Sequence, residues 1–132
     1  MILVGSSEKM NTFDNPLSYN ERRKLIKKCF PGKDVFPVSD KESDEEWVES
    51  IEEKFKFEVV VSGNEWTREC FERKNHRVKK PPFYRRDIYR GTLIRKKAKK
   101  GDESWKELVP EQVLELLEEF RFQKRMEKIE EV

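Results

Sequence analysis

Residues 91–95, with the sequence Gly-Thr-Leu-Ile-Arg, have the residue types and the spacing of an anion site. A Gly-Thr pair at the start of a helix directs free backbone amides, a hydroxyl group and the positive end of the helix dipole toward one point. Arg95 lies one helical turn beyond Thr92, near enough to add a charge-assisted hydrogen bond to the same anion. A phosphate group suits such a point. The same pattern also fits an ordinary capped helix.

The sequence has few other residues for nucleophilic or metal chemistry. His76 is the only histidine, which excludes motifs that need two, such as HExxH or HxGH. Cys29 and Cys70 lack the CxxC spacing of redox or zinc sites. We interpret both cysteines as small core residues in a reducing compartment.

The composition indicates one folded domain with a highly charged surface. Charged side chains make up 42% of the 132 residues, 29 basic against 27 acidic, for a net charge of +2. Leu, Ile, Val and Phe still number 34, which excludes disorder. The length excludes a two-domain enzyme. We expect a single domain over residues 1–132, with a charged helical tail at about 121–132, and a cytoplasmic location, since the sequence has no membrane-spanning run and no signal peptide.

Short apolar runs that alternate with helical patterns define the fold class. Strands alternating with helices predict βαβ units, hence an α/β fold with a parallel sheet and ligands at the carboxyl ends of its strands. The loops Gly5-Ser6-Ser7 and Ser62-Gly63-Asn64 follow two such ends. The expected strands are residues 2–4, 35–38, 57–61 and 77–79.

Capping signals bound the expected helices. Ser18 and Glu21 form a capping-box sequence, in which the hydroxyl accepts from the N3 amide and the glutamate reaches back to the cap, and Ser43 and Glu46 form a second. Gly101 closes the helix that begins at residue 91. The last helix has Pro110 in its first turn, and its inward positions are Val113, Leu114, Leu117 and Phe120.

Charge is segregated along the chain. Residues 40–58 carry a net charge of −6, and residues 66–100 carry +11. A polyanionic partner is therefore plausible, either the phosphates of a nucleotide or a nucleic-acid backbone. The simpler interpretation is that the lysines solvate helix faces. The densest cluster comprises Lys96, Lys97, Lys99 and Lys100.

Seven segments, in order, resemble motifs of the archaeal-type nicotinamide mononucleotide adenylyltransferases of the nucleotidylyl transferase superfamily. The resemblance extends from residue 2 to about residue 120. The segments are 3–7 (LVGSS), 15–22 (NPLSYNER), 37–48 (PVSD to WV), 61–64 (VSGN), 78–81 (VKKP), 89–95 (YRGTLIR) and 108–110 (LVP).

The resemblance implies a Rossmann-like parallel sheet with helices on both faces, and a reaction. These enzymes join nicotinamide mononucleotide to the AMP part of ATP, making NAD and pyrophosphate with Mg²⁺ and no covalent intermediate. Catalysis then consists of positioning two nucleotides and neutralising charge on the α-phosphate. Relatives form oligomers, so the resemblance also implies a homo-oligomer.

The resemblance also implies roles for individual residues. Arg22 would meet the phosphate of the mononucleotide, and Trp47 would stack on its nicotinamide ring. Judged by pattern alone, Trp47 is a core residue on an apolar helical stripe and Arg22 is a surface charge. The expected ATP-binding residues are Gly5, Ser6, Ser62, Asn64, Gly91, Thr92 and Arg95, and the expected mononucleotide-binding residues are Arg22, Asp40, Asp44 and Trp47.

The sequence departs from the family at its start and at two site positions. The family begins with a strand and a GRFxPxHxGH loop whose histidines bind the ATP phosphates, and neither is in this sequence. Either a longer product carries them, or this is a shortened relative impaired in catalysis. We favour the first, because losing a central parallel strand would open a hydrophobic sheet edge. Arg90 replaces a serine beside the phosphate position. Asp44 replaces an asparagine that meets the nicotinamide amide, and its charge would repel nicotinate mononucleotide.

Two other functions remain open at this point. A sister cytidylyl or flavin adenylyl transfer is the neighbouring possibility, although Trp47 and segment 37–48 disfavour it. The alternative from a different class is a non-catalytic nucleotide- or RNA-binding remnant that uses the basic 66–100 face. Phe83, Tyr84 and Tyr89 would be its stacking residues. The sequence has no RNP, KH or zinc pattern, so we consider a nucleic-acid partner the weaker hypothesis.

Overall fold

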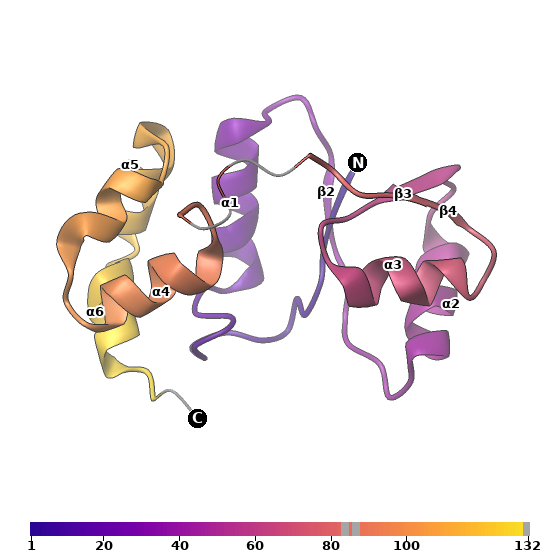
Figure 1. Ribbon diagram of the computed structural model, residues 1–132, viewed down its shortest axis with the longest axis horizontal. Helices are drawn as coiled ribbons and strands as arrows, with labels where there is room; N and C mark the ends of the chain where they lie inside the picture. Colours follow the sequence, from indigo (N-terminus) through magenta and orange to yellow (C-terminus); the bar gives the residue numbers. More distant parts are fainter. Residues whose placement is uncertain (83–84, 86–87, 131–132) are drawn as a thin grey trace. The chain divides into compact units, whose positions relative to one another are not determined.

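The computed structural model describes residues 1–82, 85 and 88–130, and it is an α/β structure with parallel strands (Figure 1). The chain forms two compact units. We call Met1–Val38 together with Arg85–Val132 the terminal unit, and Ser39–Tyr84 the central unit. The predicted alternation of strands and helices, and the parallel pairing of the strands, are confirmed. No helix in the described residues is both long and apolar enough to cross a membrane.

The terminal unit begins with a two-stranded parallel sheet. β1 (Ile2–Val4) pairs with β2 (Val35–Pro37), so that Ile2 lies opposite Val35 and Val4 opposite Pro37. α1 (Tyr19–Cys29) connects the two strands, and the hydroxyl of Tyr19 donates to the carbonyl of Val35 at 3.2 Å. The carboxyl end of β1 therefore leads directly into the loop of residues 5–18, which we call the entry loop.

The start of α1 is the capping box predicted from the sequence. The amide of Glu21 donates to the Ser18 hydroxyl at 3.2 Å, and the Glu21 carboxylate accepts from the Ser18 amide at 2.9 Å. The second predicted box is only half formed. The Ser43 hydroxyl accepts from the Glu46 amide at 3.1 Å, but within the described residues the Glu46 carboxylate makes no return bond, since it is exposed to water.

Helices from the second half of the chain supply the core of the terminal unit. They are α4 (Gly91–Lys99), the 3₁₀ helix η1 (Glu103–Leu108), α5 (Glu111–Glu119) and α6 (Phe122–Lys128). α4 packs beside α6 (Figure 1). The core consists of Leu17, Ala98, Trp105, Leu117, Phe122 and Met126.

Two left-handed residues set the helix boundaries in this half of the chain. Gly101, with φ of 76°, follows α4, and this confirms the predicted stop, because glycine adopts such a φ without a steric penalty. The last predicted helix corresponds to α5, and Arg121, with φ of 56°, separates it from α6. α6 lies in the expected charged tail, yet Phe122 and Met126 are buried at 5% and 0% exposure.

The central unit has the order helix, strand, helix, strand. α2 (Asp44–Lys54) precedes β3 (Val59–Val61), and α3 (Glu65–Glu72) connects β3 to β4 (Arg77–Lys79). β3 and β4 are parallel, with Val60 opposite Val78. β3 begins at Val59 and not at residue 57 as expected, and Phe57 makes ring contacts with Phe71 and His76.

Candidate functional site

The residues expected to bind the two nucleotides fall into two groups. One group lies in the terminal unit, and the other lies in the central unit. The terminal group is Gly5, Ser6, Arg22, Gly91, Thr92 and Arg95. The central group is Asp40, Asp44, Trp47, Ser62 and Asn64.

Arg22, on α1, binds the backbone of the entry loop. Its Nη1 donates to the carbonyl of Gly5 at 3.0 Å, and its Nη2 donates to the carbonyls of Ser6, Ser7 and Lys9 at 3.1, 3.4 and 3.1 Å. Burial lowers the pKa of Arg22, although a guanidinium stays protonated in proteins. Arg22 is thus a partly buried group that organises the loop after β1, and not the plain surface charge that its residue type suggests.

The first turn of α4 brings Gly91, Thr92 and Arg95 together. Arg95 Nη2 donates to the hydroxyl of Thr92 at 3.3 Å. A Cβ atom on Gly91 would lie 2.7 Å from Arg95 Nη1, so the guanidinium occupies space that only glycine leaves open. The side chains of Thr92 and Arg95 therefore lie at the helix N-terminus, where unpaired backbone amides favour an anion.

The guanidinium of Arg95 has no carboxylate within ion-pair distance in the described part of the chain. Its Nε is buried and makes no hydrogen bond there, and its centre lies 5.6 Å from the ring centroid of Phe13. Burial lowers the pKa of Arg95, and the charge of Asp14 opposes this shift. A buried donor without an acceptor is costly, so this arginine is suited to an anionic ligand.

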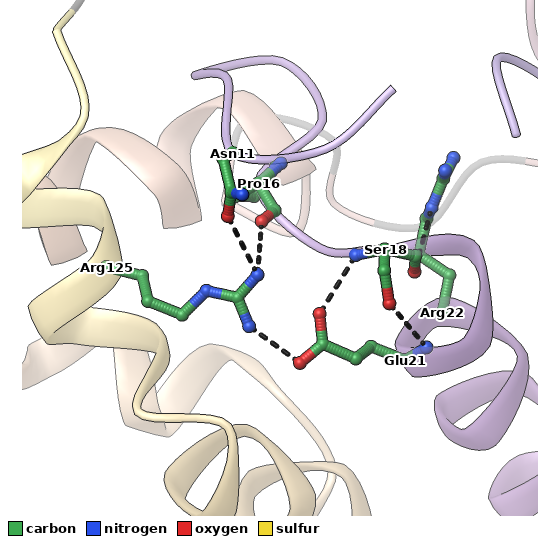
Figure 2. A network of polar contacts seen from close by, with 6 residues as sticks. All are labelled: Asn11, Pro16, Ser18, Glu21, Arg22 and Arg125. Carbon is green, nitrogen blue, oxygen red and sulfur yellow. Dashed lines mark hydrogen bonds and ion pairs between the residues drawn. The ribbon is translucent and has the colours of Figure 1, made fainter. Parts of the chain in front are cut away.

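A third arginine, which the sequence analysis did not single out, binds the entry loop from α6 (Figure 2). Arg125 Nη1 pairs with Glu21 Oε2 at 2.6 Å, and Nη2 donates to the carbonyl of Pro16 at 2.8 Å and to Asn11 Oδ1 at 3.2 Å. Burial acts to raise the pKa of Glu21, but hydrogen bonds from Arg125 and from the Ser18 amide outweigh it and lower the pKa. No sequence pattern connects residues 104 positions apart.

In the central unit, Asp44 uses both carboxylate oxygens within the protein. Oδ1 accepts from the indole Nε1 of Trp66 at 3.2 Å, and Oδ2 pairs with Arg73 Nη1 at 3.1 Å. The charge of Asp44 is therefore compensated by Arg73, an ion pair that its position in the sequence did not reveal.

Trp47 is buried at 8% exposure, in agreement with its helical spacing. Its ring centroid lies 4.8 Å from that of Trp66 and 5.6 Å from that of Phe71. Trp66 remains 44% exposed. The exposed aromatic surface at this point is therefore offered by Trp66 and not by Trp47.

The two candidate residues after β3 form the start of α3. The side chain of Asn64 is the N-cap, and its Oδ1 accepts from the amide of Thr67 at 3.0 Å. The hydroxyl of Ser62 accepts from the amide of Asn64 at 3.1 Å. Asp40 is exposed, before the start of α2. Capping thus accounts for the conformation of the Ser62 and Asn64 side chains without a ligand.

Two of the four clustered lysines in the basic segment are used inside the terminal unit. Lys97 pairs with Asp102 at 3.4 Å, and Lys99 donates to the carbonyls of Met126 and Ile129. These contacts reduce the positive charge that the cluster can offer to a nucleic acid.

Of the aromatic residues proposed to stack on RNA bases, Tyr89 is 48% exposed, whereas Phe83 and Tyr84 lie outside the described residues. Within the described residues, no group of three His, Cys, Asp or Glu side chains could hold a metal ion. A Mg²⁺ ion bound mainly by substrate phosphates and water needs no such group.

Proteins named nicotinamide-nucleotide adenylyltransferase are similar to this chain over nearly its whole length. The protein from Methanococcus maripaludis strain C5 is 37% identical, over 99% of this chain and 79% of the relative. The protein from Sulfurisphaera tokodaii is 34% identical, over 98% of this chain and 80% of the relative. The chain belongs to the nicotinamide-nucleotide adenylyltransferase family. A third member, from Ignicoccus hospitalis, is 30% identical over 98% of this chain. No protein-family profile matches the sequence.

Membership of the nicotinamide-nucleotide adenylyltransferase family confirms the resemblance drawn from the seven segments. The relatives that match are enzymes by name, and most are archaeal. The α/β fold with parallel strands is the class expected for a nucleotidylyl transferase.

Proposed function

We propose that this chain transfers the adenylyl group of ATP to nicotinamide mononucleotide, in the cytoplasm. A phosphate oxygen of the mononucleotide attacks the α-phosphorus, the bond from that phosphorus to the β-phosphate oxygen breaks, and NAD and pyrophosphate are formed. The names of the relatives support this reaction. No covalent enzyme intermediate is needed, so binding and charge neutralisation supply the catalysis.

The proposal rests on the surroundings of Arg95. This arginine is a partly buried cation at a helix N-terminus, its Nε makes no hydrogen bond to the described residues, and Thr92 lies beside it. A triphosphate supplies the acceptor oxygens and the negative charge that this arrangement lacks. Gly91 contributes the space, and Gly5, Ser6, Ser62 and Asn64 are the further residues that we propose for ATP binding. Mg²⁺ would arrive on the phosphates of ATP, where it offsets their charge.

The mononucleotide would be met by Arg22, with Asp40, Asp44 and Trp47 on the nicotinamide side. Stacking on Trp47 requires Trp66 to give up its ring contact, because Trp47 itself is only 8% exposed. The oxygens of Asp44 already accept from Trp66 and Arg73, but each has a second lone pair that could accept from a carboxamide NH₂, whereas a carboxylate has no hydrogen to donate. We therefore propose the amide form, nicotinamide mononucleotide, as the acceptor.

The test measures turnover and binding on the same protein, because the histidines of the HxGH loop are not among these 132 residues. The chain is incubated with ATP, Mg²⁺ and either nicotinamide or nicotinate mononucleotide. NAD is detected by its reduction with alcohol dehydrogenase, and ATP binding is measured by calorimetry. Formation of NAD from the amide form supports the proposal. A chain that neither forms NAD nor binds ATP would refute it.

The Arg95→Ala variant tests whether Arg95 binds ATP, and Lys96→Ala is its matched control. Lys96 is exposed on the same helix and carries the same charge. Loss of one charge-assisted contact is expected to weaken ATP binding about tenfold or more, with a change of less than about twofold in the control. Equal effects in the two variants would show that only net charge matters. Tight, steeply salt-dependent RNA binding without ATP binding would favour the non-catalytic alternative instead.

A further inference from the structure

The entry loop is held by side chains from three different helices. Arg22 of α1 binds the carbonyls of Gly5 to Lys9, and Arg95 of α4 stacks on Phe13. Arg125 of α6 binds the part of the loop next to α1. Arg22 and Arg95 are expected to contact the substrates, whereas no contact with a substrate is expected for Arg125.

Arg125 makes three polar contacts with the entry loop and α1, and they are partly shielded from water. Both arms of its fork are used, one on the Glu21 carboxylate and the other on the Pro16 carbonyl and the Asn11 side chain. The side chains of Arg125 and Glu21 are only 24% and 22% exposed. Removal of the guanidinium would therefore leave the partly buried Glu21 carboxylate with the Ser18 amide as its donor and without a cation, and the Pro16 carbonyl with the Asn11 amide alone, within the described residues.

A continuous set of hydrogen bonds connects Arg125 to Arg22 (Figure 2). The carboxylate that Arg125 holds through one oxygen accepts from the Ser18 amide through the other. The Ser18 carbonyl accepts from the backbone amide of Arg22 at 2.9 Å and from its side-chain Nε at 3.4 Å. Arg125 therefore fixes the first turn of α1, and that turn sets where the guanidinium of Arg22 lies.

The fold does not depend on Arg125 to hold α6 in place. Phe122 and Met126 anchor this helix in the core, and Lys99 donates to the carbonyls of Met126 and Ile129. The hydrogen bonds of Arg125 are made instead to the entry loop and the start of α1. Leu17 also anchors that loop in the core, so loss of Arg125 is expected to loosen the loop without unfolding the unit.

We propose that Arg125 is a positioning residue for the mononucleotide side of the site, which it serves by holding Arg22 and the entry loop in place. The inference rests on the proposed function, because it uses the expected contact of Arg22 with the mononucleotide phosphate. Preorganised contacts raise affinity by avoiding the cost of ordering on binding. Without Arg125 the loop must be ordered by the ligand itself, so affinity for the mononucleotide falls.

The test compares Arg125→Gln and Arg125→Lys with the control Lys124→Gln, which removes the same charge from the exposed neighbouring position. Dissociation constants for nicotinamide mononucleotide and for ATP are measured separately. Arg125→Gln is expected to weaken mononucleotide binding about tenfold and ATP binding several-fold less. Arg125→Lys should restore part of the loss, because an ammonium keeps the ion pair but lacks the fork. Equal weakening for both ligands, or no change, would overturn the inference.

Amide hydrogen exchange gives a readout that needs no ligand. The amides of Asn11 and Thr12 donate to the carbonyls of Pro16 and Asn15, both at 3.2 Å, so they are protected only while the loop is ordered. Arg125→Gln should speed their exchange, whereas the Ser7 amide, bound to Val38, should change less. If the wild-type chain binds no mononucleotide, the proposed function fails. Unchanged exchange in Arg125→Gln would refute the positioning role itself.

Discussion

Substituting alanine for Gly91 should weaken ATP binding without weakening the fold. The new Cβ would lie 2.7 Å from Nη1 of Arg95, against about 3.5 Å for an ordinary contact between heavy atoms. The guanidinium must therefore retreat by about 1 Å. Since hydrogen bonds span a window of only about 0.5 Å, a displacement of this size breaks the contact with a phosphate oxygen.

The substitution is expected to weaken ATP binding but not the stability of the fold. Loss of one charge-assisted hydrogen bond costs about 1.5 kcal/mol or more, which corresponds to a dissociation constant for ATP about tenfold higher. The helix, in contrast, gains from the substitution. The preference of up to about 1 kcal/mol for alanine over glycine applies to helix interiors, so Gly91, as the first residue of α4, gains at most part of it. Gly91 does not have the positive φ that makes glycine necessary at Gly101. We expect a melting temperature that is unchanged or higher by about 3 °C.

Calorimetric titration with ATP and thermal unfolding of the same samples measure both effects. Gly32→Ala is the matched control, since a Cβ there meets no described heavy atom within 4 Å. The control should bind ATP like the wild type. An affinity for ATP in Gly91→Ala within about twofold of the wild type would refute the assignment of Arg95 to the phosphates. A large loss of stability would refute the assumption that only the arginine has to move.

Two further predictions follow from ionisable groups. Because the pKa of Glu21 is lowered below its ordinary 4.5, its stabilising effect is complete above that pH and is lost as the pH falls through the lowered value. Glu21→Gln should therefore melt below the wild type at pH 7, and the gap should narrow under acid conditions below about pH 4; a gap independent of pH would contradict this. Burial raises the pKa of Cys70, and the charge of Asp44 adds to the shift. Cys70 is also only 2% exposed. In the native protein it should therefore react with a thiol reagent far more slowly than Cys29. Equal rates, followed by absorbance, would show that the core around Cys70 opens.

Local signals in the sequence predicted most of the elements correctly. The capping box at Ser18 and Glu21 and the stop at Gly101 depend on residues within one helical turn of each other, so they can be read without the fold. The same holds for Arg95, whose partner Thr92 is three positions away. Trp47 was interpreted correctly from its helical spacing as a core residue, and its proposed contact with a nicotinamide ring stays a prediction.

The features that sequence reasoning missed depend on contacts between distant segments. Trp105 is 1% exposed and donates to Gln123, yet it lies in a 3₁₀ helix too short to show a period. The break at Arg121 needs a left-handed residue that is not glycine or asparagine, so no turn signal marked it. Asp44 and Arg73 form an ion pair although they lie 29 positions apart in the sequence, so only the fold reveals it.

The entry loop has a consequence for the order in which the molecule can assemble. Residues 5–18 are synthesised well before their partner Arg125, which follows Glu21 by 104 positions and Asn11 by 114. Contacts between such distant residues close long loops and therefore carry a higher entropic cost than local contacts do. A nascent chain can complete its first helix long before α6 exists. If Arg125 orders the entry loop as proposed, the mononucleotide side of the site is complete only once α6 has been made.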